Sequence, residues 1–374
     1  MTQKGEERPL YAPGPLDLLA RAKGDLRRGL IVGVEAGDGI LPVLAAERAQ
    51  AHSLAALAAL TGAPLCVILS HTRAATLKIP LYTPGVVAVP LREGDGTAVI
   101  RHLADPASDL ASPMLGPFKA RRDPLPKGAA AAVALAKQAE LLPALVAPIA
   151  AGMWADAMRR ASLMMVSAAD IEAFADRSSA DLEMVVAADV PLAGAPKTRI
   201  VAFRPGGGGA ENLAIIVGDP DLSKPVLVRL HSECFTGDLL GSLKCDCGEQ
   251  LKGAIARMGQ EGSGILLYLA QEGRGIGLLN KLRAYALQDQ GFDTVEANER
   301  LGFNADERDF SLAAAMLKAL GVKTIRLLTN NPDKLTQLSA HGINVTVRVP
   351  HAFASNPHNE RYLATKAQKS GHQL

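Results

Sequence analysis

Three cysteines lie close together in the chain, in the pattern Cys234-x10-Cys245-Asp246-Cys247. Thiolates are soft ligands that favour zinc. In an extended backbone, a Cys-x-Cys pair sends both sulfurs to one side, and the third sulfur would come from the preceding loop. Cys66 is the only other cysteine, and four are too few for a disulfide scaffold in a chain of this size. The cluster therefore predicts a metal site in a reducing compartment.

Two kinds of zinc site fit this spacing. Three protein ligands leave the fourth tetrahedral position open to water, and zinc lowers the pKa of a bound water to roughly 7, which suits hydrolysis. A closed structural site needs a fourth ligand, and His231 stands three residues before Cys234. The spacing alone leaves both kinds open.

Two loops that follow apolar strands have residues suited to binding a nucleotide. Gln271–Gly277 contains three alternate glycines and Arg274, so backbone N–H groups and a cation can approach an anion. Thr329–Lys334 brings a hydroxyl, two amides and an ammonium to the end of another strand. Open α/β sheets bind ligands at the carboxyl ends of their strands. A tight turn and an Asn-Pro turn before a helix would explain the same residues without a ligand.

A third segment, Asn304–Asp309, places three acids around Arg308 at the predicted start of a helix. Acidic residues favour a helix N-terminus, which is sufficient to explain them. The alternative is an activated group beside a phosphate.

Short strands alternate with helices, which predicts an α/β fold with two domains, each a mixed sheet covered by helices. The apolar tract 129–155 contains charged residues and two prolines, so we expect a helix pair there and no membrane span. The polar, aperiodic segment 176–181 marks our expected boundary between a domain of residues 1–180 and one of residues 181–374. The predicted strands cover 28–34, 64–70, 199–203, 213–217, 226–230, 264–270, 324–328 and 343–349; the predicted helices cover 53–60, 128–142, 169–175, 278–290, 308–320 and 333–340.

The composition excludes several classes of protein. Hydrophobic residues make up 48% of the 374 residues, enough for two cores, so a mainly disordered chain is excluded. The formal net charge is +2, which gives no support to a general nucleic-acid binder or a polybasic membrane protein. No apolar segment of a secretory signal follows the N-terminal residues, so we expect a cytoplasmic protein.

Taken in order, these motifs resemble GTP cyclohydrolase II, the entry enzyme of riboflavin biosynthesis, over residues 182–374. The segments that carry the resemblance are His231–Cys234, Cys245–Gly248, Gln271–Gly277, Gly291–Asn298, Asp306–Phe310 and Leu327–Pro332.

The resemblance implies a set of roles. Cys234, Cys245 and Cys247 would hold a catalytic zinc whose water attacks C8 of the guanine, and a second hydrolytic step would release formate. Tyr285 would lie beside C8. Arg308 would act at the α-phosphate, as a covalent nucleophile activated by Asp306 or as a charge stabiliser, since guanidinium normally stays protonated. Mg²⁺ would accompany the leaving pyrophosphate.

The resemblance also implies the residues that bind GTP. Glu272 would accept hydrogen bonds from N1–H and the 2-amino group of guanine, which discriminates against adenine. Many family members have an arginine just before the Gln-Glu-Gly-Arg segment, where this chain has Ala270. The implied binding residues are Arg229, His231, Ser232, Glu233, Gln250, Glu272, Gly273, Arg274, Thr294, Thr329 and Lys334.

Residues 15–180 weakly resemble 3,4-dihydroxy-2-butanone 4-phosphate synthase. The acid-rich loop of that enzyme corresponds here to Glu35–Ile40, which is short and largely neutral, and its histidine segment corresponds to Lys127–Ala131. Mg²⁺ needs several oxygens in a near-octahedral array. We therefore expect a catalytically inactive first domain that serves in dimerisation, stabilisation or regulation, and we expect a homodimer because both relatives form dimers.

Two other functions stay open at this point. A bifunctional enzyme would also convert ribulose 5-phosphate, and it would need acidic metal ligands that the first half lacks. A non-catalytic nucleotide-binding regulator would use the zinc structurally, and Tyr285, Asp306 and Arg308 would then have no reaction to serve.

Overall fold

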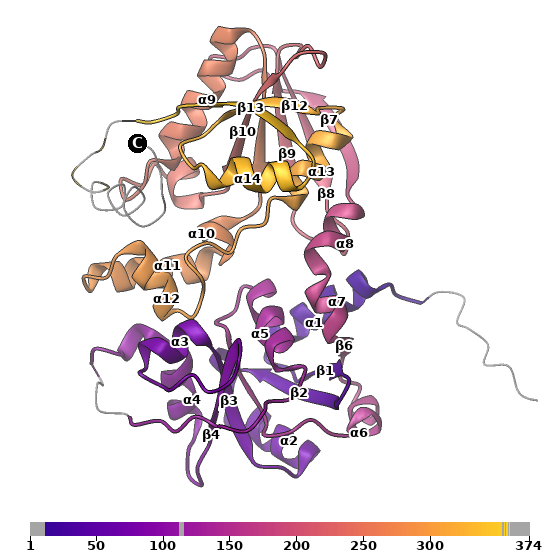
Figure 1. Cartoon of the computed structure of the whole chain (residues 1–374), viewed down its shortest axis with the longest axis vertical. Coiled ribbons are helices and arrows are strands. Elements are labelled where there is room, and N and C mark those ends of the chain that lie inside the picture. The colour runs from indigo at the N-terminus through magenta and orange to yellow at the C-terminus, as the bar shows by residue number, and fades with distance from the viewer. Residues whose placement is uncertain (1–11, 112–115, 354, 356, 358, 360–374) are drawn as a thin grey trace, which may run out of the picture.

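The computed structural model describes residues 12–111, 116–353, 355, 357 and 359, and it contains two mixed sheets stacked along the long axis (Figure 1). The first sheet has the strand order β4-β3-β5-β2-β1-β6, and the second has the order β13-β12-β10-β11-β9-β8-β7. Helices cover both sheets, so the predicted two-domain α/β architecture is confirmed.

The N-terminal half forms the first sheet and its helices. Its strands are β1 (Val32–Ala36), β2 (Gly39–Ala45), β3 (Leu65–Ser70), β4 (Val86–Pro90), β5 (Ala144–Pro148) and β6 (Met165–Ser167); its helices are α1 (Pro15–Arg28), η1 (Ala46–Arg48), α2 (Ala51–Thr61), α3 (His71–Thr76), α4 (Thr97–Ala104), η2 (Pro106–Ser108), α5 (Ala129–Gln138), α6 (Ala155–Arg160), α7 (Ala168–Glu172) and α8 (Phe174–Ala180).

The C-terminal half forms the second sheet. Its strands are β7 (Glu183–Asp189), β8 (Thr198–Arg204), β9 (Asn212–Val217), β10 (Val226–Ser232), β11 (Gly264–Leu269), β12 (Thr324–Leu328) and β13 (Asn344–Val349); its helices are η3 (Phe235–Leu239), α9 (Cys247–Glu261), α10 (Glu272–Gly275), α11 (Leu278–Asp289), α12 (Thr294–Arg300), α13 (Ser311–Ala319) and α14 (Asp333–Ala340).

Three neighbouring strands of the second sheet run parallel. β10 pairs with β11 on one side and with β12 on the other, so the carboxyl ends of all three lie at the same edge. The two predicted ligand loops follow β11 and β12, and the first cysteine follows β10. This shared edge brings together residues that are about a hundred positions apart in the chain.

Local sequence explains many of the observed boundaries. Pro15 begins α1, where its missing N–H costs nothing, and Gly29 ends the helix in the left-handed conformation, with φ of 81°. The Ser167 side chain accepts a hydrogen bond from the Asp170 N–H and caps α7.

Several sequence predictions were wrong. Residues 176–180, which the sequence presents as a polar and aperiodic segment, belong to helix α8, while the domain boundary expected after residue 180 stays a prediction. The tract 129–155 contains one long helix, α5, and the buried strand β5, in place of a helix pair. The helix predicted from Arg308 begins at Ser311. The Cys-x-Cys pair is not extended, because Cys247 is already the first residue of α9.

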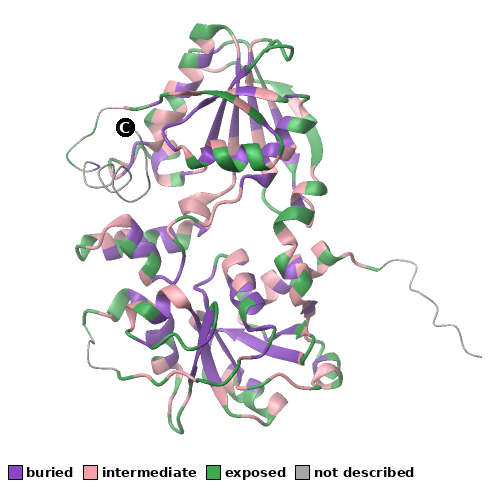
Figure 2. Ribbon diagram, in the orientation of Figure 1, coloured by how far each residue is buried: buried purple, intermediate pink, exposed green. Residues whose placement is uncertain are grey.

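Helices α10, α11 and α12 lie between the two sheets (Figure 1). Figure 2 shows buried residues on these helices as well as in the strands of both sheets. Within the described part of the chain, none of the helices combines the length and the apolarity needed to cross a membrane.

Candidate active site

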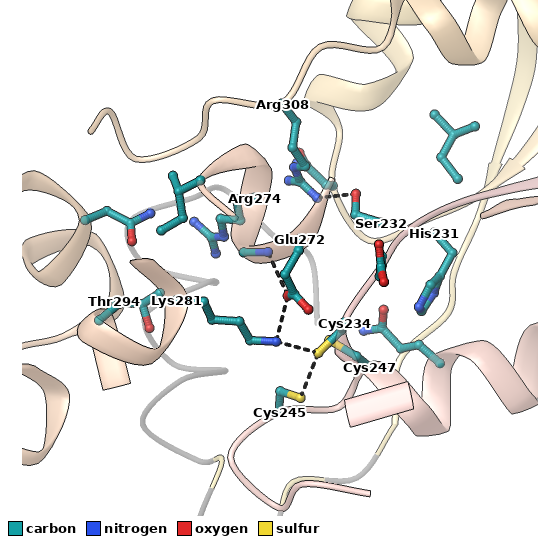
Figure 3. A pocket seen from close by; sticks show the side chains of 18 of the residues that line it. His231, Ser232, Cys234, Cys245, Cys247, Glu272, Arg274, Lys281, Thr294 and Arg308 are labelled. Atoms are coloured by element: carbon teal, nitrogen blue, oxygen red, sulfur yellow. Dashed lines mark hydrogen bonds and ion pairs between the residues drawn. The ribbon is translucent and has the colours of Figure 1, made fainter. Parts of the chain in front are cut away.

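A pocket opens at the carboxyl edge of β10, β11 and β12 (Figure 3). It is lined by every predicted site residue except Asp306, and Asp306 is paired with Arg308, which does line it. Four residues that the sequence did not single out also line it: Leu230, Lys281, Ala284 and Gln288. Four more belong to motifs that the sequence indicated, namely Ile276, Asn298, Asn330 and Asn331.

The three cysteines form the centre of the pocket. Their sulfur atoms all lie within 4.8 Å of one another, and Cys234 Sγ is 3.7 Å from Cys245 Sγ. Gly237 borders the cluster: its N–H donates to Cys234 Sγ at 3.3 Å, and a Cβ there would lie 2.8 Å from Cys245 Sγ. Hydrogen bonds from the other two thiols, with a further one from Lys281, lower the pKa of Cys234. A thiolate-rich site of this size fits a zinc ion.

Lys281 is a buried cation that the sequence analysis did not identify. Its Nζ donates to Cys234 Sγ at 3.0 Å and to Glu272 Oε1 at 2.8 Å (Figure 3). Burial disfavours its charge, but the hydrogen bonds to Glu272 and Cys234 outweigh burial and raise the pKa of Lys281. A lysine one turn before Tyr285, on the same face of the predicted helix, was the available signal.

His231 belongs to a buried network around Asp238. Its Nε2 is 3.1 Å from both carboxylate oxygens of Asp238, which also accept the Cys234 N–H and the Tyr268 hydroxyl, each at 3.0 Å. Asp238 therefore holds the loop that carries the first cysteine. His231 Nε2 is hydrogen-bonded to Asp238, and among the described residues the group of ligand atoms close enough to share a metal comprises the three sulfurs without His231, so the geometry gives no support to a fourth ligand from this residue.

Glu272 is engaged by three donors. Its Oε1 accepts from Lys281 and from the Gly273 N–H at 2.8 Å, and its Oε2 accepts from the Phe235 N–H at 2.7 Å. A carboxylate has about four lone-pair positions. Two hydrogen bonds from guanine therefore require Glu272 to exchange at least one of its present donors.

The β10 side of the pocket is basic. Arg229 donates from Nη1 to the Leu328 carbonyl at 3.0 Å and from Nη2 to Gln250, while its buried Nε has no hydrogen-bond partner among the residues that the structure describes. Burial lowers the pKa of Arg229 to about 10. Lys334 Nζ donates to the Leu230 carbonyl at 3.0 Å. This concentration of positive charge suits a polyphosphate.

Arg308 forms a two-point ion pair with Asp306. Its Nε donates to Oδ1 at 2.8 Å and its Nη2 to Oδ2 at 2.5 Å, and its Nη1 lies 3.5 Å from the Ser232 hydroxyl. Burial opposes ionisation of Asp306, but the hydrogen bonds from Arg308 outweigh burial and lower its pKa. The pair therefore favours a carboxylate and a charged guanidinium.

Tyr285 and Thr294 reach the pocket from α11 and α12. The Tyr285 hydroxyl is 3.4 Å from the Thr236 hydroxyl, and burial raises the pKa of Tyr285 to about 12. Thr294 is the first residue of α12, whose start is fixed by Asp293 as N-cap. The phenol of Tyr285 therefore stays protonated at neutral pH and remains available as a hydrogen-bond donor.

Comparisons with known proteins name the same family that the motifs of this pocket resemble. The family model described as GTP cyclohydrolase II matches residues 183–350. The chain is 49% identical over 356 residues to a GTP cyclohydrolase-2 of Azospirillum brasilense, covering 94% of this chain and 92% of that one. It is 59% identical over 175 residues to GTP cyclohydrolase-2 of Escherichia coli K12, covering 47% of this chain and 89% of the relative.

A solved two-domain 3,4-dihydroxy-2-butanone 4-phosphate synthase from A. baumannii aligns over 90% of this chain and 99% of its own, at 18% identity and a TM-score of 0.35. That score is too low to assign a shared fold. The sequence similarity to the Azospirillum brasilense enzyme, which extends over nearly the whole of both chains, decides the family: this chain belongs to the GTP cyclohydrolase II family.

Proposed function

We propose that this chain hydrolyses GTP to formate, pyrophosphate and 2,5-diamino-6-(5-phosphoribosylamino)pyrimidin-4(3H)-one, the first step of riboflavin biosynthesis. The observation that carries the proposal is one pocket containing three clustered thiols, a half-buried phenol and several basic side chains. Three water molecules are consumed: one breaks the C8–N9 bond, one releases formate from N7, and one breaks the bond between the α- and β-phosphates.

The thiol cluster fits a zinc ion with three protein ligands, Cys234, Cys245 and Cys247. Such an ion supplies a water activated for attack near neutral pH. Lys281 places a positive charge against Cys234, which offsets the negative charge of the thiolates. Asp238 holds the Cys234 backbone N–H, and so fixes the position of the first sulfur.

Tyr285 is the residue we assign to the guanine C8 region. Because its pKa is raised to about 12, the hydroxyl carries its proton throughout the physiological range. It can therefore donate a hydrogen bond to the oxygen or nitrogen on which charge develops as the ring opens. Glu272 recognises the guanine edge in this proposal, after giving up one of its present donors.

We assign the triphosphate to the basic side of the pocket. Arg229, Arg308 and Lys334 converge there, and Mg²⁺ would accompany the phosphates. The ion pair with Asp306 favours the protonated guanidinium, so we assign Arg308 to charge stabilisation at the α-phosphate in preference to covalent attack. Ala270 adds no charge where many relatives have arginine.

We further propose that the N-terminal domain does not perform the synthase reaction. Glu35 and Asp38 are both exposed, and Asp38 accepts the Lys127 N–H at 2.9 Å. Two such carboxylates are too few for a Mg²⁺ site that also anchors a sugar phosphate. We also propose a homodimer, and light scattering of the purified chain would measure its mass.

The experiment is incubation of the full-length, zinc-loaded protein with GTP and Mg²⁺, with formate and the diaminopyrimidine measured together. We expect equal amounts of both from GTP and neither from ATP, which lacks the N1–H and 2-amino donors. Zinc-loaded protein that binds GTP and releases no formate would instead be a non-catalytic nucleotide-binding regulator. A four-carbon phosphate product from ribulose 5-phosphate would contradict the proposal for the N-terminal domain.

A further inference from the structure

The helices that carry Lys281, Tyr285 and Thr294 to the pocket are packed on the N-terminal domain. Six of the buried residues between 276 and 303 belong to the same apolar cluster as residues of β3, β4, β5 and α4. Two of the six also line the pocket. The six are Ile276, Ala284, Leu287, Ala297, Leu301 and Phe303. The walls of the pocket and the interdomain core thus share side chains.

Polar contacts fix the end of α12 to the start of α3. The hydroxyls of Ser70 and Thr72 both donate to the Gly302 carbonyl at 2.7 Å. Arg73, which is fully buried, donates to the Arg300 carbonyl at 3.3 Å and pairs with Asp109 at 2.6 Å. A Cβ on Gly302 would lie 2.8 Å from the Ser70 hydroxyl and 2.8 Å from Pro143 Cγ, so the Gly302 backbone is in close contact with side chains of the N-terminal domain.

A second set of contacts holds α11. Arg283 pairs with Glu47 at 3.0 Å, and the Asn280 side chain donates to the Glu140 carbonyl at 2.9 Å. Arg283 and Asn280 lie on either side of Lys281 in the sequence, and Tyr285 follows Arg283 by two residues. The N-terminal domain therefore contacts α11 beside the residues that reach the thiols.

The helices depend on this packing for their position. α11 has 12 residues and α12 has seven, and isolated helices of that length are marginal in water. Ala284 and Leu287 of α11 and Ala297 of α12 are buried in the apolar cluster shared with the N-terminal domain, whereas Leu279 and Leu282 of α11 are exposed. The free energy that holds them in place must therefore come largely from that surface.

We propose that the N-terminal domain is a positioning element of the nucleotide site, which fixes the segment 276–303 so that Lys281 and Tyr285 face the three cysteines. The inference rests on the proposed function and gives the first domain a specific part in it. The surface comprises Glu47, Ser70, Thr72, Arg73 and Asp109 together with the apolar residues between them.

The test uses the full chain with the double variant Glu47→Gln/Thr72→Val. It removes one charge and one hydroxyl, both from the N-terminal domain and neither from the pocket. We expect kcat for formate release to fall about fivefold. KM for GTP should change less than twofold, because the groups on β10 and in the loop after β12 are untouched. Amide hydrogen exchange over residues 278–303 should become faster, with zinc content unchanged.

The matched control is Asp170→Asn/Thr83→Val. It removes a carboxylate from the Arg177–Asp170 ion pair and a buried hydroxyl that donates to the Val86 carbonyl at 2.6 Å, both within the N-terminal half. Neither residue contacts segment 276–303 through these interactions. We expect a comparable loss of thermal stability with kcat and exchange over 278–303 unchanged. The single variant Thr72→Ser, which keeps the hydroxyl, should retain wild-type kcat.

The outcomes separate the two proposals. A double variant that is less stable but keeps wild-type kcat and wild-type exchange over 278–303 overturns the positioning role. If the wild-type protein itself releases no formate, the proposed function fails, and exchange over 278–303 in the two double variants still decides whether the N-terminal domain holds the segment. If the double variant does not fold, Glu47→Gln alone provides the same comparison with a smaller expected effect.

Discussion

Two buried arginines, one in each domain, show how the two halves of the molecule differ. Arg73 in the N-terminal domain uses all three of its nitrogens: Nε and Nη2 donate to carbonyls, and Nη1 pairs with Asp109. Arg229 in the C-terminal domain lines the pocket, and its Nε finds no hydrogen-bond partner within the described part of the chain. A buried cation that the protein satisfies completely is structural, whereas one left incompletely satisfied is available to an external anion.

The cysteines repeat the same contrast. Cys66 lies between apolar strands of the first sheet, and burial raises the pKa of its thiol to about 12, so it stays protonated and unreactive. Cys234 lies among other thiols and a lysine, and its pKa is lowered. The environment of a side chain, more than its residue type, separates the two roles.

The largest effect should come from removing a predicted zinc ligand. We expect Cys247→Ser to lower zinc content to well below one ion per chain and formate release by more than about a thousandfold, because the reaction depends on the metal. Metal analysis and formate release would be measured on the same preparation. Cys66→Ala is the control and should keep both. Full zinc content in Cys247→Ser would place the metal elsewhere.

The next-largest effects should come from replacing the two buried arginines. Loss of Arg73 should lower stability, and loss of Arg229 should weaken the use of GTP. Arg73→Met leaves Asp109, whose side chain is 10% exposed, without its main partner, so we expect a loss of about 3 kcal/mol in the free energy of unfolding. Arg229→Met removes a desolvated cation from the pocket, so we expect KM for GTP to rise more than about tenfold with stability changed by about 1 kcal/mol or less. Urea unfolding and steady-state kinetics would measure the two. An equal loss of unfolding free energy in both variants would contradict the distinction between a structural arginine and a ligand-binding one.

The sequence was sufficient for the parts of the site that lie in short, ordered motifs. The cysteine spacing and the loops after β11 and β12 could be identified because each is local, and the parallel strands bring them to one edge. Lys281 and Asp238 could not be identified in this way. The role of Lys281 depends on partners nine and 47 residues away, and that of Asp238 on partners four, seven and 30 residues away, across turns whose geometry the sequence does not reveal.

The fold predictions failed where tertiary contacts override local preference. The alanine- and leucine-rich residues before Pro148 suggest a helix, yet β5 is held as a strand between β2 and β3. Residues 176–180, which the sequence presents as a polar and aperiodic segment, are part of α8, which packs against α13 of the other domain. Packing against distant elements, which the sequence pattern does not encode locally, decided both.

The smallest predicted effect compares a buried histidine from each domain. Burial, assisted by Arg229, lowers the pKa of His351 to about 4, and its Nε2 donates to the Gln250 carbonyl at 2.8 Å. Burial also lowers the pKa of His102, but Asp109 partly offsets it. Between the folded pKa and the ordinary value near 6.5, the unfolded chain binds more protons than the folded one, so stability falls as pH decreases through that window.

We therefore expect His351→Gln to flatten the decrease in urea midpoint between pH 7 and pH 5 more than His102→Gln does, and the exposed His52→Gln to leave it unchanged. A slope that is the same in His351→Gln and the wild type would show that protonation of His351 does not oppose folding. The acid sensitivity of the chain would then have to come from carboxylates whose pKa values the fold lowers, such as Asp306, whose ion pair is lost on protonation at lower pH.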